Sequence, residues 1–307
     1  MRRILTCFLV ILCLTCAVHN AAGDQIRYAV IPESPRPGDP ITIGANKTIT
    51  EAILFVNERR VARAAAFAVP GDGRSPGFSA AILTLPATID AGNAVIKLNS
   101  SMGQVAEIPV AITRREFRSE TLNLTPALTT LVTETSPERT AESQRLWAIL
   151  NTTGNQVYHS GPFVLPVTST RRTSQFGTRR INQYSDGRRV TSIHAGVDFG
   201  IPTGTEVFAC GRGRVVLARM RIISGYSVII EHAPGIYSIY YHLDSISAQE
   251  GAIVEAGEVI GLSGSTGFST GPHLHWELRV SSENTDPDAF VARPLLDKDL
   301  IISRIFN

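Results

Sequence analysis

The stretch Ser263-Gly-Ser-Thr-Gly-Phe-Ser-Thr-Gly-Pro-His-Leu-His-Trp-Glu277 lies near the end of this 307-residue chain and places two histidines one residue apart. Side chains alternate along a β-strand, so His273 and His275 would share one face while Leu274 and Trp276 point into a core. The glycines that precede the pair let the backbone approach a ligand closely. The stretch therefore predicts a strand with two imidazoles facing one cleft.

Two segments upstream carry side chains of the same kind, His194-Ala-Gly-Val-Asp198 and the lone His242. Gly196 and the following Gly200-Ile-Pro202 favour a loop that enters a strand over a helix. Each segment alone is more often a surface hydrogen bond or a structural histidine. Together with His273 and His275, these segments supply two imidazoles and a carboxylate for a metal, with two more imidazoles for catalysis. A catalytic zinc ion takes three protein ligands and keeps a fourth position for water, so the count fits a hydrolytic zinc site.

In their order and clustering these segments resemble the lysostaphin-like zinc endopeptidases that cut bacterial cell-wall peptides. The resemblance covers residues 173–290 and implies a compact set of antiparallel β-sheets with a cleft between loops. The matching segments are Ser174-Gln-Phe-Gly177 with Arg179, His194 to Thr205, Tyr240-Tyr-His-Leu243, and the stretch that ends at Glu277.

The resemblance also implies roles for five residues. His194, Asp198 and His275 would bind one zinc ion per chain, and His242 and His273 would form the catalytic pair. His273 would act as general base on the zinc-activated water, because the pKa of an imidazole lies near the working pH. His242 would donate a hydrogen bond to the oxyanion or protonate the leaving amine. The sequence leaves the division of roles between these two histidines open.

Two further residues are predicted to contact the substrate. Arg179 would meet a substrate carboxylate through its planar guanidinium, with a surface salt bridge as the alternative. Tyr240 would line the cleft, with simple strand packing as the alternative. Asp286 and Asp288 flank a proline and are predicted to be solvated loop charges, and His232 is predicted to be exposed beside a turn.

The rest of the chain predicts a mainly β protein with additional parts. Residues 24–113 show short apolar runs between turn residues, which is typical of an immunoglobulin-like β-sandwich that serves as a spacer or binds a partner. Residues 114–161 form a linker with a helix over 137–150, because Ser136-Pro137 provides an N-cap followed by proline. Residues 162–297 form the metallopeptidase domain, and 298–307 a C-terminal tail.

Residues 1–23 are typical of a secretory signal, with Arg2-Arg3 ahead of an apolar segment from Ile4 to Val18. Cleavage near Gly23-Asp24 would export the protein to the periplasm, the cell envelope or the medium, with no stable membrane association afterwards. An uncleaved anchor and a lipoprotein are the alternatives. Cys210 would then be the single cysteine left, without a disulfide partner and buried among apolar residues.

Charge excludes one class of partner. The formal net charge is +2, and loss of Arg2 and Arg3 leaves 27 basic residues (29 minus 2) against 27 acidic ones. A neutral chain of this kind does not indicate nucleic-acid binding.

The predicted function is that of an exported zinc endopeptidase acting on the peptide cross-links of bacterial peptidoglycan. One alternative is a non-catalytic regulator or wall-binding module on the same fold, and the complete set of five residues argues against it. A different zinc hydrolase, such as a carboxypeptidase for wall peptides, would need other motifs. The bond cleaved, the oligomeric state and an inhibitory role of the N-terminal region are not determined by the sequence.

Overall fold

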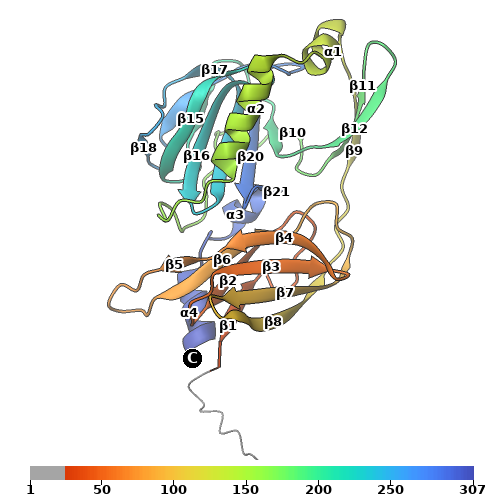
Figure 1. Ribbon diagram of the computed structural model, residues 1–307. Helices are drawn as coiled ribbons and strands as arrows, with labels where there is room; N and C mark the ends of the chain where they lie inside the picture. The colour runs from red at the N-terminus through yellow and green to blue at the C-terminus, as the bar shows by residue number, and fades with distance from the viewer. Residues whose placement is uncertain (1–24) are drawn as a thin grey trace, which may run out of the picture.

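Two β-rich units joined by a linker make up the structure, a computed structural model that describes residues 25–307 (Figure 1). The predicted mainly β architecture is confirmed. The predicted signal segment and its three cysteines lie outside the described residues. Within residues 25–307, no helix has the length and apolar character needed to span a bilayer.

The N-terminal unit consists of two four-stranded antiparallel sheets whose order is that of an immunoglobulin fold. Buried side chains from both sheets, such as Ile43, Leu54 and Ile96, form one core between them. The predicted sandwich is therefore present. The first sheet has the order β1 (Tyr28–Ile31), β2 (Pro40–Ala45), β6 (Phe78–Thr84) and β5 (Phe67–Val69). The second has the order β4 (Arg59–Ala65), β3 (Glu51–Val56), β7 (Gly92–Ser100) and β8 (Gly103–Ile112).

The linker contains the predicted helix and two elements that the sequence did not indicate. Helix α2 spans Pro137–Leu150 as predicted, and the Ser136 hydroxyl accepts a hydrogen bond from the backbone N–H of Arg139 at 3.1 Å. Leu146, Ile149 and Leu150 of α2 pack on the C-terminal unit, because they cover an apolar face of its sheet. The additional elements are strand β9 (Ser119–Asn123) and helix α1 (Pro126–Thr133).

The C-terminal unit is built around a ten-stranded sheet in which every neighbouring pair is antiparallel. Its main path has the order β10 (Arg172–Ser174), β13 (Val197–Phe199), β20 (Leu274–Val280), β17 (Ile236–Ile246), β16 (Gly225–Ala233), β15 (Gly213–Arg221) and β18 (Ile253–Val254). Strands β14 (Glu206–Phe208), β19 (Val259–Ser263) and β21 (Glu283–Thr285) pair beside this path, and α3 (Asp288–Ala292) follows it. A separate three-stranded sheet has the order β12 (Arg189–Ile193), β11 (Arg179–Gln183) and β9.

Residues 298–307 form a helix, so the predicted tail is corrected. Helix α4 (Lys298–Phe306) packs on β1 and β2 of the N-terminal sandwich and buries Ile301 and Ile305 completely. Strand β2 is buried along its whole length, because one face meets the sandwich core and the other meets Leu295 and Ile301 at the chain end. The chain end therefore fastens the two units together.

Three smaller predictions about polar residues are also corrected. Asp286 and Asp288 form ion pairs with Arg115 and Arg172, at 2.5 and 2.8 Å, and are not freely solvated. His232 is fully buried, which lowers its pKa to about 3. The two aspartates hold segments of the chain together through ion pairs, and His232 packs inside the C-terminal unit. None of the three lines the cleft. Cys210 is a buried free cysteine, as predicted.

Candidate metal centre

Two of the predicted ligands face each other across neighbouring strands. Asp198 on β13 lies directly opposite His275 on β20, so a pair 77 residues apart in sequence becomes adjacent through strand pairing. His194 reaches the same point from the turn before β13. At Gly196 in this turn a side chain would collide with the carbonyl oxygen of Trp276 on β20, so the close approach needs glycine. The predicted loop entering a strand is confirmed.

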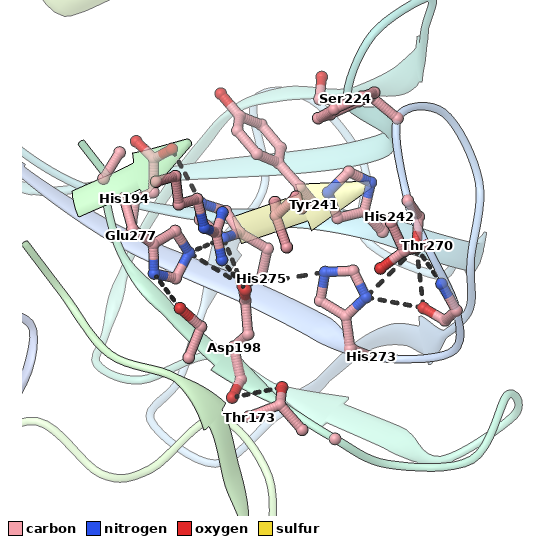
Figure 2. Close-up of a pocket in the computed structure, with 18 of the residues that line it drawn as sticks. Thr173, His194, Asp198, Ser224, Tyr241, His242, Thr270, His273, His275 and Glu277 are labelled. Carbon is pink, nitrogen blue, oxygen red and sulfur yellow. Dashed lines mark hydrogen bonds and ion pairs between the residues drawn. The ribbon is translucent and has the colours of Figure 1, made fainter. Parts of the chain in front are cut away.

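The three side chains converge on one point (Figure 2). Asp198 Oδ1 lies 2.6 Å from His275 Nδ1 and 3.1 Å from His194 Nε2, and the two nitrogens are 3.0 Å apart. Three ligands about 2.0 Å from a tetrahedral zinc ion would be roughly 3.3 Å apart. The donor triangle has nearly this size.

The outer nitrogen of each ligand ring determines which nitrogen is left for a cation. His194 Nδ1–H donates to the backbone oxygen of Gln175 at 2.9 Å, and His275 Nε2–H donates to Oε1 of Glu277 at 3.0 Å. Both acceptors have no proton to give, so the neutral rings turn the lone pairs of His194 Nε2 and His275 Nδ1 toward each other and toward Asp198. Two lone pairs and a carboxylate facing one point repel unless a proton or a metal cation lies between them. The donor set therefore fits a metal ion, with Gln175 and Glu277 orienting the ligand rings.

The charges around the triangle favour a cation as well. Burial alone would raise the pKa of Asp198, but the rings of His275 and His194 hold it well below its ordinary value. Burial lowers the pKa of His194, which keeps this ring neutral. Burial also acts to lower the pKa of His275, but Asp198 and Glu277 outweigh it and raise the pKa to about 9. The site thus stabilises positive charge beside Asp198 Oδ1.

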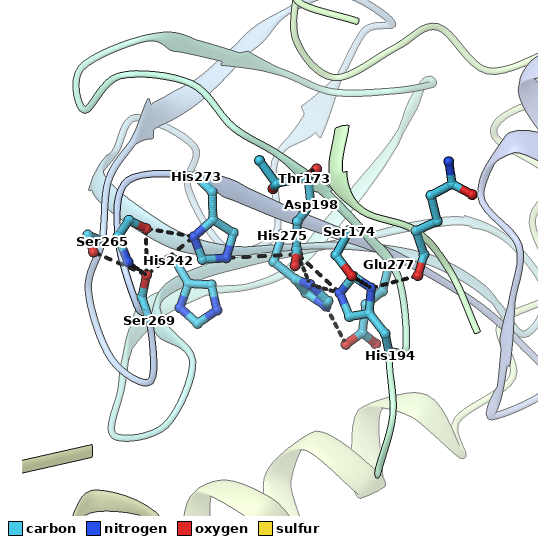
Figure 3. Close-up of polar contacts among 12 residues, drawn as sticks. Thr173, Ser174, His194, Asp198, His242, Ser265, Ser269, His273, His275 and Glu277 are labelled. Atoms are coloured by element: carbon cyan, nitrogen blue, oxygen red, sulfur yellow. Dashed lines mark hydrogen bonds and ion pairs between the residues drawn. The ribbon is translucent and has the colours of Figure 1, made fainter. Parts of the chain in front are cut away.

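The predicted catalytic pair lies beside the triangle (Figure 3). The ring centroids of His242 and His273 are 4.8 Å apart, and His273 Nε2 lies 3.8 Å from Asp198 Oδ1. His242 Nδ1–H donates to the carbonyl oxygen of Thr266, and His273 Nδ1–H to that of Gly271, both at 2.8 Å. Each ring therefore keeps a bare Nε2 for proton transfer. All five predicted residues are brought into one site.

His242 has an unusual backbone conformation. Its φ of +61° lies in the left-handed region, which is rare for a residue with a side chain and is often found at functional sites. The pairing of β16 with β17 shifts register next to it. Strand alternation would put Tyr240 and His242 on one face, but this local turn brings His242 to the face of Tyr241.

The predicted substrate contacts of Tyr240 and Arg179 are corrected. Tyr240 is completely buried and its hydroxyl accepts from the backbone N–H of Cys210, so it belongs to the core. Tyr241 takes the place beside the site, with its ring stacked on His275 at 5.7 Å. Arg179 donates to the carbonyl oxygens of Gly177 and Ala87 and does not line the pocket.

The site lies in a cavity of about 530 Å³. Three walls can be distinguished: the strands that carry the ligands, the glycine-rich loop 268–272, and the sheet that contains β9. The sequence analysis assigned no role to several residues that line this cavity. Tyr241 and Glu277 belong to the matching segments, whereas Glu120, Leu122, Arg171 and Arg180 lie outside them.

Comparison with known proteins gives the family. Residues 192–287, which carry all five site residues, match the model of peptidase family M23. The C-terminal unit is an M23 peptidase domain. The predicted family of metallopeptidases is thereby confirmed, and the M23 domain holds the candidate metal centre.

Two relatives that are named for their activity each match less than half of this chain. DD-carboxypeptidase/endopeptidase Mpg of Neisseria meningitidis is 38% identical over 44% of this chain and 30% of its own length. Peptidoglycan DD-endopeptidase ShyA of Vibrio cholerae is 43% identical over 38% of this chain and 26% of its own length. This chain thus spans less than a third of either relative.

A solved structure supports the fold beyond the M23 domain. A Pseudomonas aeruginosa protein described as a peptidase M23 is 21% identical, covers 84% of this chain and 94% of its own, and has a TM-score of 0.55. Because 84% of the chain is covered, the likeness extends into the N-terminal unit.

Proposed function

We propose that this chain is an exported zinc endopeptidase that hydrolyses peptide cross-links of bacterial peptidoglycan. The observation that carries the proposal is the convergence of His194, Asp198 and His275 on one point, with the bare nitrogens of His242 and His273 beside it. The names of the relatives Mpg and ShyA support peptidoglycan as the substrate. The signal-like residues 1–23 support export.

Zinc is the proposed ion, one per chain. Two imidazole nitrogens and one carboxylate oxygen form a donor set that zinc accepts in catalytic sites, with a fourth position left open. When bound, zinc supplies a water of lowered pKa and polarises the substrate carbonyl.

The chain's own residues then handle the protons. His273 Nε2 lies beside the open side of the ligand triangle, so we assign it to take the proton of the attacking water. His242 faces the same space, and once its Nε2 carries a proton it would donate a hydrogen bond to the developing oxyanion or protonate the leaving amine. Because Nδ1 of each ring is bound to a loop carbonyl, a ring must first receive a proton at Nε2 before it donates one.

Arg171 takes over the role predicted for Arg179. It lines the cavity, and no carboxylate pairs with it in residues 25–307, whereas Arg180 in the same cavity is bound by Glu120 and Asp198. Its Nη1 donates to the carbonyl oxygen of Gly200 at 3.1 Å, two residues beyond the ligand Asp198. Gly200 directly follows β13, the strand that carries Asp198, so Arg171 is held at the same end of the cavity as the ligand triangle. We assign Arg171 to a carboxylate of the wall peptide.

One experiment tests the function directly. Purified protein is incubated with peptidoglycan sacculi, with chelator, and with chelator followed by zinc, and the released fragments are identified by mass spectrometry. We expect release of un-cross-linked peptides that stops with chelator and returns with zinc. His159→Gln, which changes an imidazole outside the cavity, is the control for variants of His242 and His273 in the same assay. Zinc binding without release from sacculi or from soluble cross-linked dimers would instead support the non-catalytic alternative.

A further inference from the structure

The interdomain linker forms part of the wall of the metal site. Strand β9 pairs in parallel with β11, in a register that places Glu120 opposite Arg180. Burial alternates along β9, so Glu120 and Leu122 face inward, and both line the cavity. Glu120 precedes the residues that match the family model by more than seventy positions.

The carboxylate of Glu120 begins two hydrogen-bond chains that end at two different ligands. Its Oε1 accepts from Arg180 Nε at 2.5 Å, and Arg180 Nη2 donates to Asp198 Oδ2 at 2.7 Å. The same Oε1 accepts from the Ser174 hydroxyl at 3.0 Å, and Ser174 Oγ lies 3.2 Å from His194 Nδ1. One side chain of the linker thus supports both Asp198 and His194.

The two oxygens of Asp198 have separate tasks in this arrangement. Oδ1 faces the imidazole nitrogens, whereas Oδ2 is held by Arg180. Glu120 holds the other side of the same guanidinium, so that only Nη2 is directed at Asp198. With Glu120 neutralised, Arg180 can turn its planar fork onto both oxygens of Asp198, because guanidinium groups bind carboxylates in bidentate fashion. Arg180 would then compete with the metal for Oδ1, and its positive charge would lie uncompensated near the ion.

We propose that Glu120 is a positioning residue of the metal centre, so that the linker between the two units completes the site. The inference rests on the proposed zinc site and adds a residue that acts through Arg180 and Ser174. The alternative is an ordinary ion pair, since the Glu120 side chain is 28% exposed. Exposed pairs contribute about 0–1 kcal/mol to stability and would leave metal affinity unchanged.

The test compares Glu120→Gln with Glu116→Gln in the full chain. Glu116 lies on the same linker and forms an exposed ion pair with Arg114, which makes it a matched control. The zinc dissociation constant is measured by competition with a chromophoric chelator, without substrate. We expect roughly 10–100-fold weaker zinc binding for Glu120→Gln, as for other groups that orient ligands, and no change for Glu116→Gln.

Two further measurements keep the outcome decisive. Glu120→Asp retains the charge and should recover part of the lost zinc affinity. Zinc affinity that was lost through misfolding would not follow the charge at position 120 in this way. At saturating zinc, kcat of Glu120→Gln should return toward that of the unaltered protein. Zinc affinity of a folded Glu120→Gln within twofold of the unaltered protein overturns the inference. A protein that binds zinc with this dependence on Glu120 but cleaves no peptidoglycan overturns the proposed function alone.

Discussion

The two halves of the cleft are held in different ways. The ligand half, which consists of His194, Asp198 and His275, lies on paired strands and is supported by a buried carboxylate and a guanidinium. The catalytic half, which consists of His242 and His273, is anchored by carbonyl oxygens within the segment 266–271. This difference in anchoring indicates that metal binding and proton transfer depend on separate parts of the fold. Substitutions in one half should therefore leave the other intact.

The largest effect is expected in the ligand half. Asp198→Ala removes one ligand and leaves Arg180 without its ion pair to Asp198 beside the two remaining ligand rings. We expect loss of stoichiometric zinc and of zinc-dependent hydrolysis together, measured by metal analysis after dialysis and by fragment release. Retention of one tightly bound zinc with full activity would place the metal elsewhere and break the comparison.

The next largest effect is expected in the catalytic half. His273→Ala should lower kcat by roughly 10²–10⁴-fold, the usual contribution of a general acid or base, while zinc content stays at one per chain. His242→Ala should behave in the same way. A variant that loses zinc and activity in parallel would show that the two halves are coupled, and a fully active His273→Ala would refute its role as base.

A smaller effect is expected from the carboxylate that orients His275. Glu277 is buried, and the charges of Arg279 and His275 overcome burial to lower its pKa to about 2, so it carries charge at the ring. Glu277→Gln should weaken zinc binding by roughly 10–100-fold in a chelator competition. Glu283→Gln on the exposed part of β21 is the control. Equal zinc affinity in both variants would assign Glu277 to packing alone.

The residues of the ligand half were predicted through short motifs and the family that these motifs resemble. Alternation in His273-Leu-His275 predicted two imidazoles in one cleft, the resemblance assigned His194, Asp198 and His275 to the metal, and the structure brings these three together. The immunoglobulin-like unit and helix α2 followed from equally local patterns, namely turn spacing and an N-cap.

The remaining features depend on long-range contacts that a single sequence does not show. The prediction that Tyr240 lines the cleft failed because the left-handed backbone of His242 interrupts strand alternation. The prediction for Arg179 failed because its guanidinium donates to the carbonyl oxygens of Gly177 and of Ala87 in the N-terminal unit. Glu120 enters the site through parallel pairing of β9 with β11, and nothing in the local pattern indicates that partner.

The smallest effect is expected at the substrate end of the cleft, where Arg171 is assigned to a carboxylate of the wall peptide. Arg171→Gln should raise KM roughly tenfold with little change in kcat, because a charge-assisted hydrogen bond is lost outside the reacting atoms. Arg188→Gln, at the exposed tip of the β11–β12 hairpin, is the matched control. Substrates with amidated carboxyl groups provide the sharper measurement: the unaltered protein should show the raised KM on them, and Arg171→Gln should no longer distinguish the two forms. If Arg171→Gln still prefers the free carboxylate by the original factor, another residue of the cleft makes this contact.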